Sequence, residues 1–364
     1  MDLPFLVLVL TLLIFGLVML YSASYAVGYY RFDDSAYFIK KQLLFAIVGI
    51  IVMFIAANFD YHRFHTLAWP LYGVSLVLLV VVLFTAEING AHRWISIPGL
   101  STVQPSEIAK FAVILVFAHM ISLKYAKMKT LTHGVIPFGV ALMPVVILMV
   151  LETHLSGTIL IVSIGGCMMF VGGTDIRWFL LAAGIFVVGI VSAIIIKPDL
   201  VPVAMDRINM WQNPFEDVLG KNYQTRQSLL AIGSGGLTGL GLGNSRQKHL
   251  YVPEPANDFI FSIVCEELGF IGATIVILLF IALFLRGMYI AITAKDKFGA
   301  MLVVGIVFQI VLQAMLNIAV VTNTIPNTGI SLPFFSHGGS SLLMLLGEIG
   351  VVLNVSRSAN LEKT

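Results

Sequence analysis

Long apolar runs separated by short polar segments make up most of the chain. An α-helix needs about 20 apolar residues to cross the hydrocarbon core of a bilayer, and ten runs of roughly that length carry few or no charges. They are residues 4–24, 42–59, 66–86, 106–123, 134–151, 156–173, 178–196, 258–285, 299–322 and 339–356. This pattern predicts an all-α, polytopic integral membrane protein with about ten transmembrane helices. We expect one domain over residues 1–364.

The last two runs belong to a stretch, residues 298–347, that contains no Asp, Glu, Lys or Arg. Pro326, Gly329 and Pro333 interrupt this stretch near its middle, and both residue types break helices. We therefore expect two helices joined by an uncharged loop. Ten is an even number of crossings, so both chain ends are expected on the same side of the membrane.

Composition agrees with this class and excludes others. Charged residues make up 11 % of the chain and hydrophobic residues 59 %, whereas about 25 % of an average soluble domain is charged. Such an apolar chain cannot cover a water-facing surface, which excludes a soluble enzyme, a disordered chain and a nucleic-acid-binding protein. Cys167 and Cys265 both lie within apolar runs, so no disulfide framework is expected.

Basic residues predict the orientation, because cytoplasmic segments are enriched in Lys and Arg. With the N-terminus inside, ten basic residues fall in short inner segments and five in short outer ones. The inner ones are Arg63, Lys124, Lys127, Lys129, Arg177, Arg286, Lys295, Lys297, Arg357 and Lys363, and the outer ones are Arg31, Lys40, Lys41, Arg93 and Lys110. We therefore predict a multi-pass protein of the cell membrane with both termini in the cytoplasm. Residues 1–24 lack the basic n-region of a cleaved signal peptide.

Residues 197–257 are the least membrane-like part of the chain. They hold 11 of its 40 charged residues (21 basic and 19 acidic). In the predicted orientation they form a large extracytoplasmic loop between helices seven and eight. A loop of this length is usually functional. Residues 88–105 are too short and too broken to cross the membrane, and they predict an interfacial strand or half-helix.

Ionisable side chains at membrane depth cost several kcal/mol unless they are paired, so each is a candidate functional group. Glu107 and Lys110 begin one predicted helix. They can share a face, either in a substrate site or as a local ion pair at the interface. Asp258 lies at the start of another predicted helix. Either Asn257 or Asp258 is the N-cap of that helix, or Asp258 is a base at the level of the lipid headgroups.

Five further ionisable side chains have less specific interpretations. At 100° per residue, Glu266 and Glu267 are rotated by about 80° and about 180° from Asp258, so the three carboxylates cannot all face one site. Glu152 and His154 predict an interfacial boundary, and Glu348 is expected to be a buried partner of a basic side chain.

Six glycines between Gly233 and Gly243 form a dense cluster, followed by Arg246 and Lys248. The backbone amides of such a segment can cradle a pyrophosphate, or its glycines permit tight packing. No nucleotide-binding glycine motif is present. No His, Cys, Asp or Glu cluster has metal-ligand spacing, but a divalent cation such as Mg²⁺ or Mn²⁺ can bind where acidic side chains and phosphate supply oxygens together.

Four groups of segments resemble the SEDS proteins (shape, elongation, division and sporulation) of the RodA/FtsW/SpoVE type. The segments are Asn89-Gly-Ala-His-Arg-Trp94 with Gln104-Pro-Ser-Glu-Ile-Ala-Lys110; Trp211-Gln-Asn-Pro-Phe215 with Tyr223-Gln224 and Gln227-Ser-Leu-Leu-Ala-Ile-Gly-Ser-Gly-Gly-Leu237; Gly241-Leu-Gly-Asn-Ser-Arg-Gln-Lys248 with Tyr251-Val-Pro-Glu-Pro-Ala-Asn-Asp-Phe-Ile-Phe-Ser262 and Glu266-Glu-Leu-Gly269; and Asn317 to Thr322 with Thr328-Gly-Ile-Ser-Leu-Pro-Phe-Phe-Ser-His-Gly-Gly-Ser-Ser341 and Leu353-Asn-Val-Ser-Arg357. The resemblance covers essentially the whole chain.

Proteins of this family polymerise lipid II, a disaccharide-pentapeptide on undecaprenyl pyrophosphate, and work with a class B penicillin-binding protein that cross-links the strands. The resemblance therefore implies a peptidoglycan glycosyltransferase at the outer face of the cytoplasmic membrane, acting in division, elongation or sporulation. It places the family's essential acid at Asp258. It also puts five residues near the substrate, namely Lys110, Glu107, Arg93, Lys248 and Glu254.

Two positions depart from the family pattern. Relatives often read Pro-Asp-Leu-Gly-Thr where this chain has Thr153-His-Leu-Ser-Gly-Thr158, and His337 stands where a Tyr is common. The roles of that aspartate and of that tyrosine are therefore not carried over.

In the implied reaction, Asp258 takes a proton from the acceptor's sugar hydroxyl, and cations stabilise the leaving pyrophosphate. Two other functions fit the same sequence. A lipid II flippase or transporter needs a polar path through the bilayer but no base, and a scaffold for a class B penicillin-binding protein needs only a docking surface.

Overall fold

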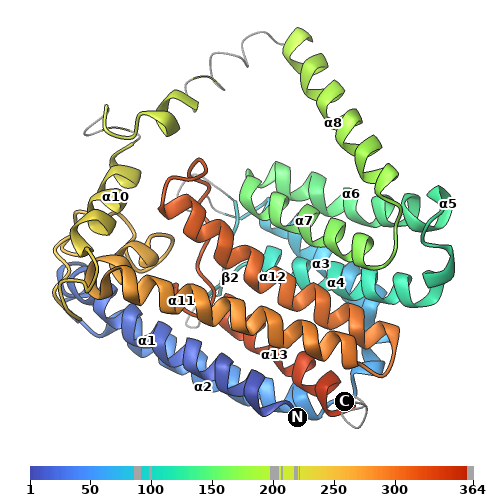
Figure 1. The fold of residues 1–364 in the computed structure, drawn as a ribbon, viewed down its shortest axis with the longest axis horizontal. Coiled ribbons are helices and arrows are strands. Elements are labelled where there is room, and N and C mark those ends of the chain that lie inside the picture. The colour runs from blue at the N-terminus through green and yellow to red at the C-terminus, as the bar shows by residue number, and fades with distance from the viewer. Residues whose placement is uncertain are drawn as a thin grey trace.

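The computed structural model describes residues 1–85, 92–97, 101–196, 205, 208–216, 220 and 222–358, which form a bundle of long helices (Figure 1). The first half contains α1 (Leu3–Phe32), α2 (Tyr37–Asn58), η1 (Tyr61–Arg63), α3 (Phe64–Val82), β1 (Ile95–Ile97), β2 (Ser101–Val103), α4 (Pro105–Lys124), η2 (Tyr125–Lys127), α5 (Leu131–Gly134), α6 (Ile136–Leu151) and α7 (Leu155–Val171). The second half contains α8 (Ile176–Ile196), α10 (Tyr223–Gly235), α11 (Ile260–Thr293), α12 (Lys297–Val321) and α13 (Gly339–Ser358).

Within the described residues, eight helical segments are long and apolar enough to cross a membrane, and two shorter apolar helices, α7 and the first part of α8, accompany them. Each predicted span coincides with one of these helices, so the polytopic all-α class is confirmed. The number of crossings stays a prediction. Apolar side chains also face outward: Leu3, Val7 and Ile14 on α1 are all more than half exposed. Such a surface is suited to lipid rather than to water.

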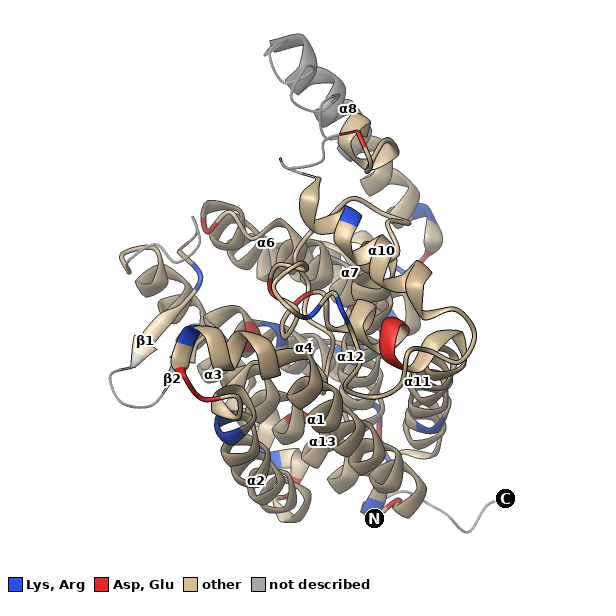
Figure 2. Ribbon diagram, turned by 90° about the vertical axis from the view of Figure 1, so that its left-hand side faces the viewer, with Lys and Arg blue, Asp and Glu red and all other residues tan. Residues whose placement is uncertain are grey.

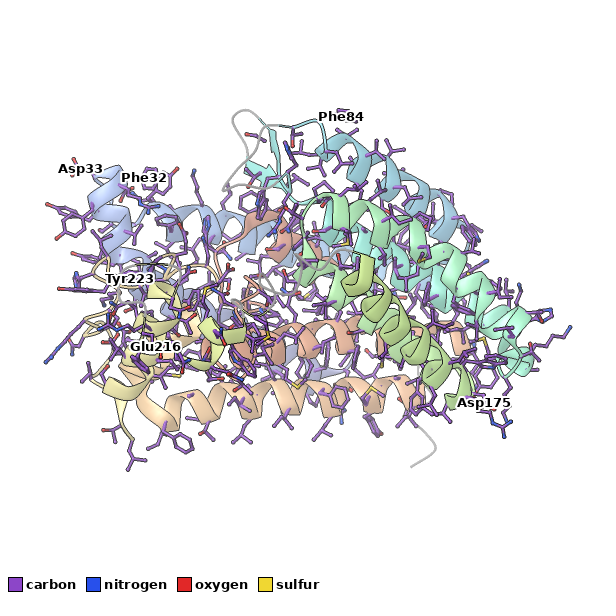
Figure 3. All side chains as sticks on the ribbon, turned by 90° about the horizontal axis from the view of Figure 1, so that it is seen from above. Phe32, Asp33, Phe84, Asp175, Glu216 and Tyr223 are labelled. Atoms are coloured by element: carbon purple, nitrogen blue, oxygen red, sulfur yellow. The ribbon has the colours of Figure 1, made fainter. Side chains whose placement is uncertain are left out.

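The two ends of the described chain lie side by side (Figure 1). The Asp2 amide donates a hydrogen bond to Ser356 Oγ at 3.0 Å, and Arg286 binds the Asp2 carboxylate at 2.9 and 2.7 Å. Asp33, Glu216 and Tyr223 lie at one end of the bundle, and Asp175 lies at the opposite end (Figure 3). The described part of the predicted large loop is therefore at the Asp33 end.

The segment before α4 is a short antiparallel hairpin in which Ile95 pairs with Val103 and Ile97 with Ser101. The strand prediction is confirmed there, while its position at a membrane interface stays a prediction. Because α4 begins two residues after β2, the hairpin brings Arg93 and Gln104 close to the first turn of α4.

Helix α11 is interrupted at Gly269, whose φ of +66° is left-handed. A membrane-spanning helix cannot leave backbone groups unpaired in lipid, and the segment after α10 supplies the missing partners. The amides of Leu240 and Gly241 donate to the carbonyls of Glu266 and Glu267 at 3.0 and 2.9 Å. On the other side of the break, the Phe270 and Ile271 amides donate at 2.9 and 3.1 Å to carbonyls of the same segment.

The glycine cluster makes this close approach possible. A Cβ on Gly235 would lie 2.0 Å from the Cys265 carbonyl oxygen, and one on Gly239 would lie 2.1 Å from that of Glu267. Figure 2 shows the acidic turn of α11 facing the connection that follows α10. The structure therefore favours tight packing of these glycines against α11, and it corrects the alternative of a pyrophosphate cradle.

Gly239→Ala is expected to destabilise the protein strongly. The new side chain would clash with the α11 backbone, and the φ of +78° at this position alone costs an L-residue about 1–2 kcal/mol. Thermal unfolding of the purified protein measures the change. Gly233→Ala is the matched control, because a Cβ there meets no atom within 4 Å. An equal melting temperature for the Gly239 variant and the parent would contradict this account.

Candidate active site

A polar cavity of about 470 Å³ lies where the hairpin, the first turns of α4 and α7, the segment before α11, and the connection from α12 to α13 converge. Five of the six residues proposed from the sequence line it: Arg93, Glu107, Lys110, Glu254 and Asp258. The first three precede or begin α4, whereas the last two come about 150 residues later in the chain. The fold therefore brings together groups that are far apart in the sequence.

Asp258 is held by its backbone, which leaves its carboxylate free. Asn317 of α12 donates through Nδ2 to the Asp258 carbonyl oxygen at 2.7 Å and to that of Ile330 at 2.6 Å. Gly329 comes so close that a Cβ would lie 3.3 Å from Asp258 Oδ2. Phe259 is the N-cap of α11 and makes no side-chain cap bond, so the N-cap interpretation of Asp258 or Asn257 is wrong.

The surroundings of Asp258 make its carboxyl group a stronger base than a free aspartate. Burial raises the pKa of Asp258 to about 6, the nearby Glu254 carboxylate adds to the increase, and Arg93 opposes it. Glu254 is itself held in place, since it accepts a hydrogen bond from Asn257 Nδ2 at 2.7 Å and lies 3.8 Å from Arg31 of α1.

Lys110 and Glu107 form the ion pair that their spacing predicts, with Nζ 2.9 Å from Glu107 Oε2. The pair lines the cavity rather than lying at an outer interface. Lys110 also donates to Gln313 Oε1 at 3.0 Å, and Gln313 in turn donates to the Ser331 carbonyl oxygen at 3.1 Å. The buried cation is therefore fixed between α4 and α12.

Arg93 lies between two carboxyl groups. Its Nη2 donates to the Thr153 carbonyl oxygen at 2.6 Å. Burial lowers the pKa of Arg93, and the charges of Asp258 and Glu152 oppose that change. The hydrogen bond ties the Arg93 side chain to the turn between α6 and α7, beside the cavity.

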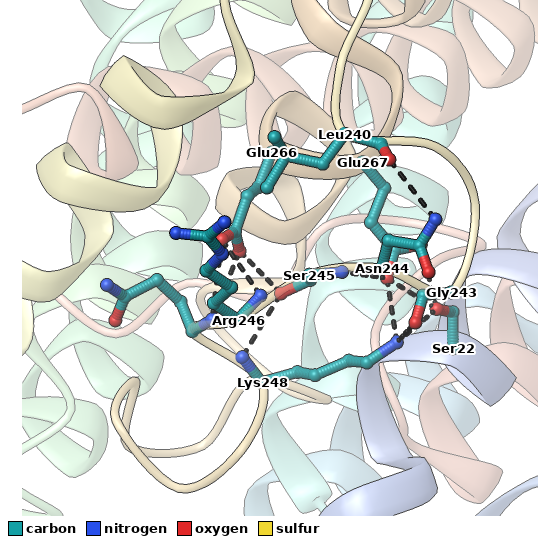
Figure 4. Close-up of polar contacts among 10 residues, drawn as sticks. Ser22, Leu240, Gly243, Asn244, Ser245, Arg246, Lys248, Glu266 and Glu267 are labelled. Atoms are coloured by element: carbon teal, nitrogen blue, oxygen red, sulfur yellow. Dashed lines mark hydrogen bonds and ion pairs between the residues drawn. The ribbon is translucent and has the colours of Figure 1, made fainter.

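Lys248, the sixth proposed residue, lies outside this cavity in a buried cluster (Figure 4). Its Nζ pairs with Glu267 Oε1 at 2.9 Å and donates to the Gly243 carbonyl oxygen at 2.6 Å and to Ser22 Oγ at 3.2 Å. The backbone amide of Arg246 donates to Glu266 Oε1 at 3.0 Å. The structure thus corrects the expectation that Lys248 lies beside the other five residues. Its contacts fasten the glycine segment to α1 and α11.

Glu152 and His154 are buried rather than placed at an interfacial boundary, with 1 % and 8 % exposure. Neither Glu152 oxygen has a hydrogen-bond partner among the described residues. Burial raises the pKa of Glu152 to about 8, so this group is mostly neutral near pH 7. His154 lines the cavity, and burial lowers its pKa to about 3, with the charges of Arg93 and Lys110 adding to the decrease.

The structure also gives the surroundings of Glu348 and His337. Glu348 accepts a hydrogen bond from Gln309 Nε2 at 3.0 Å, so the partner that the structure gives it is an amide rather than the expected cation. His337 lines the cavity, and its ring meets Phe38 edge-on at 5.1 Å. Its backbone amide donates to the Ala256 carbonyl oxygen at 2.8 Å, which holds the segment just before Asp258.

Sequence reasoning missed Gln313 and Asn317, which hold Lys110 and Asp258. A signal was present. Gln309, Gln313 and Asn317 recur every four residues in a predicted span without charges, and this spacing places three amide side chains on one helix face. Amides carry no charge, so a search for ionisable groups passes over them.

The described residues contain no group of three or more His, Cys, Asp or Glu side chains that could hold a metal ion. Glu254 and Asp258 are the two acidic groups that approach each other on the cavity wall, and Glu107 is taken by Lys110. The side chains of the described residues alone therefore supply too few ligands to hold a divalent cation.

Comparisons with known proteins agree with this architecture. The family model described as "Cell cycle protein", which covers FtsW, RodA and SpoVE, matches residues 2–361. Stage V sporulation protein E of Bacillus subtilis is 44 % identical, over 98 % of this chain and 97 % of its own length. A probable peptidoglycan glycosyltransferase FtsW of Trichlorobacter lovleyi is 39 % identical, over 99 % of this chain and 94 % of its own length.

Two solved structures have the same fold. A chain from a study of polymerisation and crosslinking by a peptidoglycan synthase complex superimposes with a TM-score of 0.81 at 27 % identity, over 98 % of this chain and 97 % of its own. The Thermus thermophilus rod shape determining protein RodA does so with a TM-score of 0.71 at 26 % identity, over 99 % of this chain and 97 % of its own. The chain therefore belongs to the FtsW/RodA/SpoVE family of multi-pass membrane proteins.

Proposed function

We propose that this protein is a peptidoglycan glycosyltransferase that polymerises lipid II. The observation that carries the proposal is the Asp258 carboxylate. It faces a polar cavity, no described residue donates a hydrogen bond to it, and two cations, Arg93 and Lys110, line the same space. A base opposite a cationic region suits the transfer of a sugar from a diphosphate leaving group. The names of the FtsW relatives support the same activity.

The reaction forms a glycosidic bond between the acceptor glycan and the donor glycan. The acceptor's hydroxyl oxygen attacks the anomeric carbon of the donor, and Asp258 takes the hydroxyl proton. The bond between that carbon and the diphosphate oxygen breaks, and its electron pair stays on the diphosphate. Negative charge grows there in the transition state, and Arg93 and Lys110 are placed to stabilise it. Glu107 holds Lys110, and Glu254 tunes Asp258.

The cavity is proposed to open at the outer face of the cell membrane, with both termini in the cytoplasm. The excess of basic residues in the segments on the other side supports this orientation. The resemblance to a chain of a peptidoglycan synthase complex supports a class B penicillin-binding protein as partner. Division, elongation and sporulation are all open as settings for this activity.

A divalent cation, Mg²⁺ or Mn²⁺, would take most of its oxygen ligands from substrate phosphate and water, because Glu254 and Asp258 are the two carboxylates within reach. Both ions accept such ligand sets. Every step described above is carried by side chains of the protein.

A lipid II flippase and a scaffold for the cross-linking enzyme are the alternatives. Neither needs an unpartnered carboxylate in the cavity. Transport of labelled lipid II into proteoliposomes, if it survived Asp258→Asn while no polymer formed with the parent protein, would favour the flippase.

Asp258→Asn is expected to lower the rate of lipid II polymerisation by about 10²–10⁴-fold, the usual contribution of a general base. The amide is nearly isosteric and cannot take a proton. Glycan ladders made by the reconstituted protein with its cross-linking partner measure the rate, and an unchanged melting temperature shows that the variant is folded. Polymerisation at the parent rate would remove Asp258 from the mechanism.

The pH dependence follows from the pKa of about 6 at Asp258. The base acts only when ionised, so the initial rate is expected to rise with pH through about 6 and then level off. At pH 5 about one tenth of the groups are ionised, and the rate falls roughly tenfold. Glu254→Gln removes a neighbouring negative charge and is expected to shift this limb to lower pH. A flat profile from pH 5 to 7 would contradict the assignment.

Replacing each of two buried lysines by glutamine separates a site role from a structural one. Lys110→Gln is expected to lower turnover at least tenfold. The change in melting temperature is expected to be small, because the Glu107 carboxylate that loses its partner still lines the cavity. Lys248→Gln leaves Glu267 buried without its counter-charge, which costs roughly 3–5 kcal/mol, so its main effect is on the melting temperature. The reverse pattern would return Lys248 to the substrate site.

A further inference from the structure

The first turns of α4 and α7 lie together on one wall of the cavity. Gln104 and His154 are the N-caps of these helices, and both line the cavity. The second residues of the helices, Ser106 and Ser156, line it as well. Farther along, α4 and α7 pack against each other, because a Cβ on Gly165 would lie 3.0 Å from the Phe117 ring. The two helices therefore run side by side in the same direction.

No side chain among the described residues caps either helix start. The first backbone N–H groups of an α-helix have no partner within the helix, and they carry partial positive charge. Anions bind at such positions because the N–H groups and the helix dipole both favour negative charge. Helix α4 begins with Pro105, which has no N–H, and the Glu107 N–H donates to the Gln104 carbonyl oxygen at 3.1 Å. The first turn of α4 therefore offers the Ser106 N–H, and the first turn of α7 adds its own N–H groups on the same wall.

Unpartnered polar side chains lie at the same wall. Ser106 Oγ, Ser156 Oγ and His154 Nδ1 have no hydrogen-bond partner among the described residues, although the serines are 1 % and 2 % exposed. A buried hydroxyl without a partner is destabilising, so these groups are expected to meet a ligand. A change of the serine χ1 rotamer moves the Oγ atom and can turn it toward the cavity.

Positively charged side chains also lie near the first turns of α4 and α7. Lys110 lies one turn after Ser106 on α4. Arg93 Nη2 donates to the carbonyl oxygen of Thr153, the residue before the N-cap of α7. Lys110 has three N–H donors, of which Glu107 and Gln313 take two. Asp258 and Glu254 line the same cavity from the segment before α11, and their negative charge would repel an anion.

We propose that the paired first turns of α4 and α7, with Ser106, Ser156 and Lys110, form the diphosphate-binding wall of the cavity. This assignment rests on the proposed glycosyl transfer and adds a direction to it. The leaving diphosphate lies at the helix starts, and the acceptor hydroxyl lies toward Asp258. The ligand class is a diphosphate ester, and the lipid chain is recognised elsewhere.

The test compares the double variant Ser106→Ala/Ser156→Ala with the parent, both as full chains in detergent. Isothermal titration calorimetry measures the Kd for undecaprenyl diphosphate, undecaprenyl monophosphate and inorganic pyrophosphate. Two hydrogen bonds to a charged ligand are lost, so the Kd for the lipid diphosphate is expected to rise about tenfold or more. The monophosphate is expected to change less. Parallel weakening of inorganic pyrophosphate binding would assign recognition to the diphosphate itself rather than to the lipid.

Ser24→Ala is the matched control. Ser24 on α1 also has a buried hydroxyl without a partner in the described structure, but it does not line the cavity. Its variant is expected to bind the lipid diphosphate with the parent Kd. Equal weakening in the control, or no weakening in the double variant, would overturn the proposal.

The outcome also separates this inference from the proposed function. If the parent binds the lipid diphosphate through the serines but makes no polymer under any condition, the wall stands and the glycosyltransferase proposal fails. If the double variant polymerises lipid II with the KM of the parent, the wall is overturned while the proposed function stands.

Discussion

The arrangement of this protein depends on one constraint, that no backbone group stays unpaired in a nonpolar environment. Helix α11 breaks at Gly269, and the glycine segment after α10 supplies the hydrogen bonds that the helix has lost. The carboxylates of Glu266 and Glu267, at the same turn, hold residues 245–248. Glu254 and Asp258 follow this segment in the chain, so the repair of the helix break also anchors the start of the connection that carries the base.

The cavity is built from neutral amides as much as from charges. Gln313 and Asn317 lie one turn apart on α12 and reach Lys110 on one side and the Asp258 backbone on the other. A buried ion needs several partners to offset its desolvation, and an amide gives a donor and an acceptor without adding charge. These two side chains therefore position the acid and the cation relative to each other.

The polar groups of the cavity are unevenly satisfied. Lys110 is paired with Glu107 and Gln313, whereas the Asp258 carboxylate accepts no hydrogen bond from a described residue, and the hydroxyls of Ser106 and Ser156 have no partner there. Pairing fixes the cation in advance, which lowers the reorganisation required during reaction. The unpaired groups are those expected to contact substrate, because a buried polar atom without a partner is rare unless a ligand supplies one.

The sequence determined the class of protein and the positions of its helices, because apolar length is a local property of the chain. Rare ionisable groups at membrane depth singled out Glu107, Lys110 and Asp258 as candidates, and the resemblance to the family added Arg93, Glu254 and Lys248. It also predicted that Asp258, Glu266 and Glu267 could not share a site, from helix periodicity alone. Only the tertiary structure decided that Lys248 pairs with Glu267, that the glycines pack against α11, and that Glu152 and His154 are buried. These outcomes depend on which segments meet in space, and spacing along the chain carries no information about a partner more than one helix away.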